Sequence, residues 1–295
     1  MNRTYRWIKA RDIIMRGVFL FCAAFSVLAL GCVCLFLFAN GLPFIGKVGV
    51  SNFFGTRWHL YSGAYGILSM IVASLYVTAL STTIGVTVGL FTAVSLYRFC
   101  PTKLVAPIMQ MINLLAGIPS VIYGLFGLII IVPFLRDYIS PNGMGYGILA
   151  ASIVLSVMIL PTIVSISLHA LNTVPKSYYE GALALGATKE QSVFTVMIPA
   201  AKSGIFAAVV LSIGRAIGET MAVIMVIGGS PTMPKSLFQS VRTLTANIAM
   251  GATELSGDAA TALISCGVVL FFFTLLLNIS FSLLRGGVSY ENKSA

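Results

Sequence analysis

Long runs of uncharged, mostly apolar residues alternate with short charged clusters along the chain. Five runs of 26 to 40 residues carry no charged side chain, and a sixth apolar stretch is interrupted only by Arg215 and Glu219. A helix needs about 20 apolar residues to cross the hydrocarbon core of a bilayer. The pattern therefore predicts an all-α membrane protein with six transmembrane helices, near 17–39, 66–96, 104–133, 145–170, 204–228 and 260–284.

This pattern predicts one membrane domain, 17–284, between a short N-terminal segment, 1–16, and a tail, 285–295. The first apolar run is longer than the roughly 7–15 residues of a signal-peptide core, so we expect it to remain as a helix. Most predicted loops are short, but the loop at 172–203 is long enough to fold on its own.

Composition supports the membrane assignment and excludes other classes. Hydrophobic residues make up 58% of the 295 residues, and charged residues make up only 9%. Soluble domains carry about 25% charged residues, so this chain cannot cover a surface that faces water. A soluble enzyme, a nucleic-acid-binding module and a disordered regulator are thereby excluded, and membrane lipid is the expected surrounding.

The formal net charge of +10 mainly reports topology. If the N-terminus is cytosolic, the predicted cytosolic segments hold 12 Lys and Arg residues, and the opposite segments hold 5. Basic residues concentrate in the cytosolic loops of membrane proteins. We therefore expect both termini and the loop at 172–203 to be cytosolic.

Few residues suit catalysis or metal binding. The chain has neither a Gly-x4-Gly-Lys-Ser/Thr phosphate loop nor a His-Glu-x-x-His zinc motif. The two histidines are far apart in sequence, and four of the five cysteines fall in predicted helices, where small apolar filler is the simpler role. An intramembrane enzyme is therefore disfavoured, and we expect no metal site at His59, His169, Cys22, Cys32, Cys34, Cys100 or Cys266.

The loop at 172–203 reads as a compact helix, turn and helix. Residues 173–175 give a helix-start signal of Thr followed by Pro, and Gly186 is a suitable end for a helix over 176–185. Thr188 and Gln191 fit a capping box for a second helix that ends near Ile198. Apolar and aromatic side chains on the first helix fit a groove on a partner protein. They equally fit a helix pair that lies on the membrane surface.

A spaced motif in this loop favours the partner protein. Glu180-Gly181-Ala182, three residues, Gly186, nine residues and then residues 196–199 resemble the signature cytosolic loop of ABC importer permeases. The spacing matches at every anchor, although Gly181, Val196 and Ile198 stand where Ala, Ile and Leu are usual. In that family the loop docks into the ATPase subunit, which implies a coupling role for Glu180, Gly181, Ala182, Leu183 and Gly186.

Two further motifs narrow the resemblance. Residues 116–124 and 214–223 resemble the third- and fifth-helix motifs of phosphate importer permeases, and the second is closer to the PstC type than to the PstA type. Residues 228–231 also fit the PstC type, and the resemblance covers roughly residues 65–285. It implies the MetI-like bundle of a type I ABC importer.

Within the apolar stretches, a few residues are candidates for the substrate path. Arg215 lies near the middle of the predicted fifth helix, and an ionised Arg there costs at least about 2.5–3.5 kcal/mol. Glu219 is four residues away, which predicts one shared helix face. The pair either lines the path or locks the subunit to a partner. Pro119 and Ser120 are path candidates where the third helix is interrupted, whereas Gly124 and Gly127 suggest close helix packing.

The resemblance implies an inner-membrane permease subunit that moves inorganic phosphate by alternating access. Its implied partners are a homologous PstA-type permease, an ATPase dimer and an external phosphate-binding protein. ATP and Mg²⁺ would bind the ATPase, and no cofactor would bind this chain. A permease for phosphonate, sulfate or molybdate remains open. A stand-alone secondary transporter is less favoured, because the chain shows no second copy of the motif at 116–124 or at 214–223.

Overall fold

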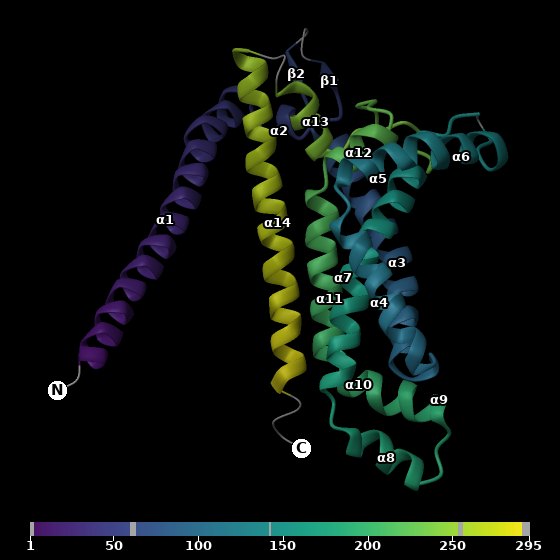
Figure 1. Cartoon of the computed structure of the whole chain (residues 1–295). Helices are drawn as coiled ribbons and strands as arrows, with labels where there is room; N and C mark the ends of the chain where they lie inside the picture. The colour runs from purple at the N-terminus through teal and green to yellow at the C-terminus, as the bar shows by residue number, and fades with distance from the viewer. Residues whose placement is uncertain (1–2, 60–62, 142, 253–255, 291–295) are drawn as a thin grey trace.

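The computed structural model describes residues 3–59, 63–141, 143–252 and 256–290 of the chain. Residues 1–2 of the predicted N-terminal segment and 291–295 of the predicted tail lie outside the described residues. The described part is almost entirely helical (Figure 1). Its elements are α1 (Arg3–Val48), α2 (Val50–Phe53), β1 (Trp58–His59), β2 (Ala64–Tyr65), α3 (Leu68–Val94), α4 (Thr102–Gly117), α5 (Ser120–Phe126), α6 (Val132–Tyr138), α7 (Ile148–Thr173), α8 (Lys176–Ala184), α9 (Lys189–Gln191), α10 (Ile198–Ala200), α11 (Lys202–Gly218), α12 (Met221–Val226), α13 (Leu244–Gly251) and α14 (Asp258–Tyr290), with π-helical turns η2 (Ser95–Phe99), η3 (Gly127–Ile131) and η4 (Ser192–Met197).

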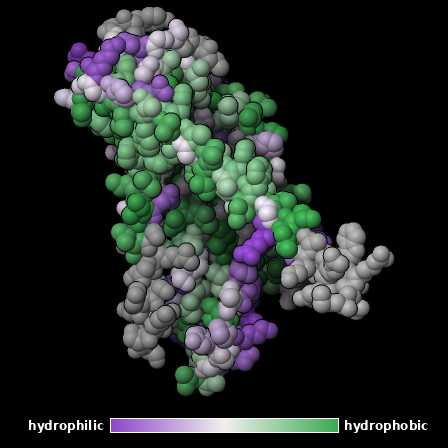
Figure 2. Space-filling view, turned by 90° about the vertical axis from the view of Figure 1, so that its left-hand side faces the viewer, coloured by the Kyte–Doolittle hydropathy of each residue, from purple (hydrophilic) through white to green (hydrophobic). Residues whose placement is uncertain are grey.

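The predicted all-α membrane fold is confirmed. Among the described residues, 5 helices are long and apolar enough to cross a membrane, and the bent pair 189–200 and 202–218 raises the number to 6. The visible face in Figure 2 is largely apolar, with hydrophilic residues mainly toward its upper and lower parts. Such a band is what a bilayer requires of the surface that it contacts.

Helix α7 forms the centre of the bundle. In its most apolar window 67% of the residues are buried, against 28% for α3 and for α14. The α3 helix lies along α7 with glycines at the contact: a Cβ on Gly85 would lie 2.7 Å from Ile159 Cδ1, and one on Gly89 would lie 2.7 Å from Ile163 Cγ2. Helices without a hydrophobic driving force between them associate through such close backbone approach.

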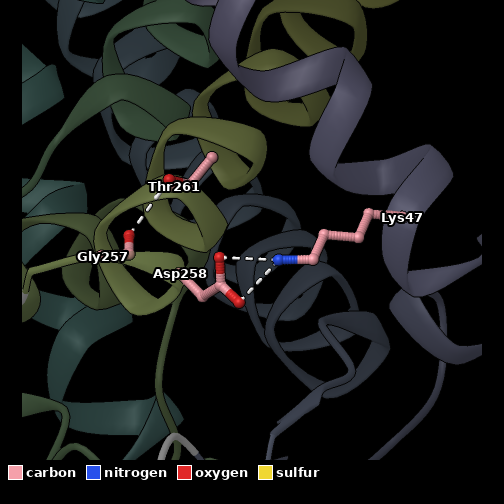
Figure 3. Close-up of polar contacts among 4 residues, drawn as sticks. All are labelled: Lys47, Gly257, Asp258 and Thr261. Atoms are coloured by element: carbon pink, nitrogen blue, oxygen red, sulfur yellow. Dashed lines mark hydrogen bonds and ion pairs between the residues drawn. The ribbon is translucent and has the colours of Figure 1, made fainter.

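The described side chains of α1 that pack against the bundle lie in its second half. Its residues 11–33 are all exposed, and the helix diverges from α14 toward its N-terminal end (Figure 1). Near the other end, Ser265 Oγ donates to the Gly41 carbonyl at 2.9 Å, and Lys47 Nζ lies 2.8 Å from Asp258 Oδ2 (Figure 3). Because this ion pair is exposed, it contributes at most about 1 kcal/mol.

A small layer covers one end of the bundle. Strands β1 and β2 pair antiparallel, with Trp58 opposite Tyr65 and His59 opposite Ala64, and they lie beside α2 and α13 (Figure 1). Helix α8 lies at the other end, together with the start of α1 and the end of α14. The covering layer has its own apolar cluster, which includes Phe44, Phe53, Trp58, Ile67, Met70 and Leu244.

Several predicted helix boundaries are wrong. The first helix extends from Arg3 to Val48 instead of 17–39, because the polar residues before it continue the helix and Pro43 does not end it. The last helix continues to Tyr290, so part of the predicted tail is helical. The fifth predicted helix, 204–228, is not continuous, whereas the interruption predicted in the third helix, 104–133, is present, and the two breaks form the candidate site.

The glycine contact between α3 and α7 yields the first prediction. Gly89→Val places new atoms against Ile163 and should destabilise the fold by about 1–3 kcal/mol, as overpacking does. The measurement is the apparent Tm of the purified protein in detergent. Gly31→Val is the matched control, because nothing lies within 4 Å of a Cβ at that helical glycine. Equal Tm values for the two variants would contradict the packing role.

Candidate functional site

The first helix break separates α4 from α5. Ile118 and Pro119 adopt extended backbone angles, with ψ values of 127° and 140°. Proline has no N–H and disfavours helix in the residue before it, so the break follows from Pro119. Carbonyls of the last turn of α4 thereby lose their helical partners. The Leu115 carbonyl accepts a 3.2 Å hydrogen bond from the Ile118 N–H and a second, 2.7 Å bond from Tyr123 Oη on α5.

The second break separates α11 from α12. Glu219 is extended, with φ −72° and ψ 129°, and α12 starts at Met221. The Glu219 carboxylate accepts a 3.2 Å hydrogen bond from the Ala222 backbone N–H. Thr245 Oγ1, from α13, donates to the Glu219 carbonyl at 3.2 Å. Both the side chain and the backbone of Glu219 therefore compensate the break.

This geometry corrects the expectation for the charged pair. Arg215 and Glu219 do not share a helix face, because the helix ends at Gly218 between them. Although both residues belong to the described part, no ion pair joins them. Arg215 lies in the last turn of α11, and Glu219 lies at the start of α12. Each charge thus lies at the helix end whose dipole favours it.

The two half-helices α5 and α12 pack against each other. A Cβ on Gly124 would lie 3.0 Å from Ala222 Cα, and one on Gly127 would lie 2.8 Å from Val226 Cγ1. The prediction that these glycines serve close packing is confirmed. The packing brings the segments that follow the two breaks side by side.

Arg215 lies on an open face of α11. Its side chain is exposed, and its guanidinium Nη1 makes one long contact of 3.5 Å with Thr162 Oγ1 on α7. A Cβ on Gly214 or Gly218 would meet nothing within 4 Å. Leu211, one turn earlier, is 58% exposed. Residues 211, 214, 215 and 218 therefore form one face of α11 that no described residue covers, although this helix is an apolar segment.

The end of α4 is similarly open. No residue of α4 is buried, Pro119 is exposed, and Ser120 is partly buried. A Cβ on Gly117 would meet nothing within 4 Å. Pro119 and Ser120 thus lie at a helix break beside exposed residues of α4, as Arg215 lies beside exposed residues of α11. The structure assigns no hydrogen bond between these residues and Arg215.

The loop at 172–203 folds largely as predicted. Helix α8 ends in a Schellman motif: Gly186 has φ 89°, its N–H donates to the Leu183 carbonyl, and the Ala187 N–H donates to the Ala182 carbonyl. The capping box of Thr188 and Gln191 is present. Thr173 is wrong as a helix start, because it is the last residue of α7 and Pro175 precedes α8. The second helix includes a π-helical turn and ends at Ala200, beyond the predicted Ile198.

Helix α8 presents apolar surface outward. Leu185 is 91% exposed, Tyr178 is 54% exposed and Leu183 is 37% exposed. Glu180 and Gly181 are exposed, and Ala182 is partly buried. Tyr179 points inward: it is buried, and the Arg98 guanidinium carbon lies 4.1 Å from its ring centroid. The helix is therefore anchored on one side and free on the other.

Tyr123 and Thr245 were not identified from the sequence, although they donate hydrogen bonds to backbone carbonyls at the two helix breaks. Tyr123 lies inside the motif at 116–124, and a hydroxyl one turn after a proline is a usable sign of a donor for freed carbonyls. Thr245 has no such sign, because it is 26 residues from Glu219 in sequence. Among the described residues, no group of three or more His, Cys, Asp or Glu side chains could hold a metal ion.

Comparisons with known proteins agree with this architecture. The family model described as "binding-protein-dependent transport system inner membrane component" matches residues 85–289. The phosphate transport system permease protein PstC of Mesorhizobium japonicum is 34% identical, over 94% of this chain and 90% of that protein. The probable ABC transporter permease protein YqgH of Bacillus subtilis is 40% identical, over 94% of this chain and 91% of that protein.

Two solved structures share the fold. An inward-facing MetNI methionine ABC transporter gives a TM-score of 0.61 at 23% identity and covers 75% of this chain and 95% of its own. A bacterial alginate ABC transporter gives a TM-score of 0.63 at 16% identity and covers 98% of this chain and 97% of its own. At these identities the likeness establishes the fold alone.

The Tyr123 hydroxyl yields the second prediction. Tyr123→Phe keeps the ring but leaves the Leu115 carbonyl without this donor, which should cost about 1 kcal/mol. The apparent Tm should fall relative to that of the parent protein. Tyr138→Phe is the matched control, because that side chain is 79% exposed and its loss of a hydroxyl should be neutral. A neutral Tyr123→Phe would refute the bridging role.

Proposed function

Because the chain belongs to the family of binding-protein-dependent transport system inner membrane components, we propose that it is the PstC-type permease subunit of an ATP-driven phosphate importer. The similarity to proteins named as PstC phosphate permeases supports phosphate as the transported substrate. The exposed guanidinium of Arg215 on the apolar helix α11 supports it from the physical side. We also propose that the chain resides in the cytoplasmic membrane.

The observation that carries the proposal is the open face around Arg215. A cation in an apolar span is tolerated only where it faces protein or water. No residue that the structure describes lies within 4 Å of a Cβ built on Gly214 or Gly218 beside it. A second permease subunit across a water-filled path satisfies this requirement, and lipid does not. Guanidinium also presents a planar set of donors that matches phosphate oxygens.

The position of Glu219 supports an anion path. A carboxylate facing Arg215 would compete with a phosphate group for the guanidinium. Glu219 instead accepts from the Ala222 N–H, so Arg215 keeps its charge available. Pro119 and Ser120 form the facing break on α4 and α5, and we assign them to the same path.

Helix α8 is proposed to dock into the ATPase subunit through its exposed end. Glu180, Gly181, Ala182, Leu183 and Gly186 hold the shape of this end, and Leu185 supplies apolar contact. The start of α1 and the end of α14 lie at the same end of the bundle as α8 (Figure 1). With the basic residues concentrated there, we place this end in the cytosol.

In this mechanism an external binding protein delivers phosphate to the opposite end. ATP and Mg²⁺ bind the separate ATPase subunits, whose closure moves α8. The substrate crosses between this subunit and a homologous one, proposed to be PstA-like. This chain supplies the guanidinium that holds the anion and the helix that receives the motion.

Replacing the path cation gives the third prediction. Arg215→Gln should lower the uptake of radiolabelled phosphate by reconstituted complexes at least about tenfold, because loss of a charge-assisted bond of about 1.5–3 kcal/mol acts on the transport step. Assembly is checked by co-purification of the ATPase subunit. Arg11→Gln, on the exposed part of α1, is the matched control.

Wild-type uptake by an assembled Arg215→Gln complex would refute the role of Arg215. Sulfate, molybdate and phosphonate should be tested beside phosphate for stimulation of ATP hydrolysis. If one of these anions stimulates ATP hydrolysis more strongly than phosphate does, that anion is the substrate. The assignment of the chain as a permease would be unaffected.

Two glycines in the coupling segment give the fourth prediction. Gly186→Ala forces an L-residue to φ 89°, which costs about 1–2 kcal/mol and should distort the end of α8. ATPase co-purification and phosphate-stimulated ATP hydrolysis should both fall. Gly181→Ala is the matched control within the coupling segment, because Ala is the usual residue of the family motif at this position, the glycine is helical and its added Cβ meets nothing within 4 Å. Equal behaviour of the two variants would count against coupling through this turn.

A further inference from the structure

A hollow of about 550 Å³ lies between α8 and the membrane bundle. Its walls come from η2 and the start of α4 on one side, the end of α7 on another, and α8 and α9 below. It therefore lies beside the contact through which Tyr179 packs the proposed coupling helix against Val94 and Leu171 of the bundle. It shares no lining residue with the candidate path at Arg215.

The hollow has a mixed polar and apolar lining, and its charged side chains are all basic. Arg98 and Lys189 are its charged residues, and no carboxylate is among the lining residues. Neither cation forms an ion pair within the part of the chain that the structure describes. Tyr97, Thr102 and Asn172 add hydroxyl and amide groups to the same walls. Hydrogen bonds lower the pKa of the neighbouring Glu190 carboxyl, and the nearby charge of Lys189 also contributes to this lowering. Two cations in one lining still leave a local excess of positive charge, which an anion bound there would offset.

The Arg98 side chain is held in place before any ligand arrives. Its guanidinium carbon lies 4.1 Å from the ring centroid of Tyr179, which is 3% exposed. An arginine stacked on a buried ring loses less freedom when it binds an anion. The stacking also joins η2, the turn that follows α3, to α8.

We propose that this hollow binds a phosphate group and that the bound group ties α8 to the ends of α3 and α7. The guanidinium of Arg98 and the ammonium of Lys189 hold the oxygens, and the neutral polar groups complete their hydrogen bonds. The phosphate group comes either from inorganic phosphate in the cytosol or from an anionic phospholipid headgroup at the membrane surface. In either case occupancy restrains the coupling helix and so regulates the importer. This regulatory role rests on the proposed function, whereas the binding itself does not.

Cys100 provides a direct probe, because it lines the hollow and is partly exposed. The experiment measures the rate of Cys100 alkylation by a maleimide in the assembled complex, with peptide mass spectrometry to separate it from the other cysteines. The complex is reconstituted in nanodiscs of phosphatidylcholine, with inorganic phosphate or with chloride at equal ionic strength. A second set of nanodiscs contains phosphatidylglycerol without added phosphate.

Inorganic phosphate at ten times its dissociation constant should slow alkylation about tenfold by mass action. Arg98→Gln with Lys189→Gln should abolish this protection, and Lys189→Gln alone should weaken it while it leaves the Tyr179 contact in place. Lys103→Gln is the matched control, because Lys103 is exposed nearby and does not line the hollow. Each variant is compared with itself with and without phosphate, since a nearby cation also changes thiol reactivity.

Protection by inorganic phosphate identifies the free anion as the source, and protection only in phosphatidylglycerol identifies the lipid headgroup. Absence of protection in both sets overturns the proposal, as does equal protection by chloride or protection that survives the double substitution. Arg215→Gln separates this site from the transport path. It should lower uptake at least about tenfold and leave the protection of Cys100 unchanged.

Discussion

The need to satisfy every backbone polar group inside an apolar environment governs this structure. Two helices are broken within predicted spans, and each break frees N–H and C=O groups that lipid cannot satisfy. Three side chains supply the missing partners: Tyr123 donates to Leu115, Glu219 accepts from Ala222, and Thr245 donates to the Glu219 carbonyl. Each unsatisfied group in hydrocarbon would cost several kcal/mol, so these side chains stabilise the breaks, and at Leu115 they add to the backbone bond from the Ile118 N–H.

The second break also explains an unfavourable charge order. In a continuous helix, Arg215 four residues before Glu219 would be the weaker arrangement of an ion pair. The break gives each charge a different helix end, with the cation in the last turn of α11 and the carboxylate at the first turn of α12. Glu219 is thereby occupied with backbone, and the guanidinium stays open toward the uncovered face. The extended backbone at Glu219 thus lets its carboxylate cap α12, and it leaves the Arg215 guanidinium exposed on α11.

Local features of this fold could be predicted from sequence, and features that depend on distant partners could not. The left-handed turn at Gly186 and the capping box at Thr188 follow from neighbouring residues, and both are confirmed. Pro119 indicated the first break for the same reason. Residues 204–228 contain no proline, so only the distant Thr245 and the packing of α12 on α5 show that this stretch is two helices. The residues around Arg215 likewise do not show which molecule covers the open face of α11.

The segment 189–200 and helix α11 connect the proposed ATPase-coupling helix α8 to the candidate path at Arg215. Segment 189–200 continues into α11 across a bend of 70°, and α11 carries Arg215 near its far end. At 1.5 Å per residue, Arg215 lies about 20 Å along the axis from the start of α11. A rotation of about 6° at the bend therefore displaces the guanidinium by about 2 Å, enough to break a hydrogen bond to an anion. In the proposed mechanism, small movements of α8 at the ATPase thus suffice to release phosphate, and a restraint on α8 acts on transport without contact with the path.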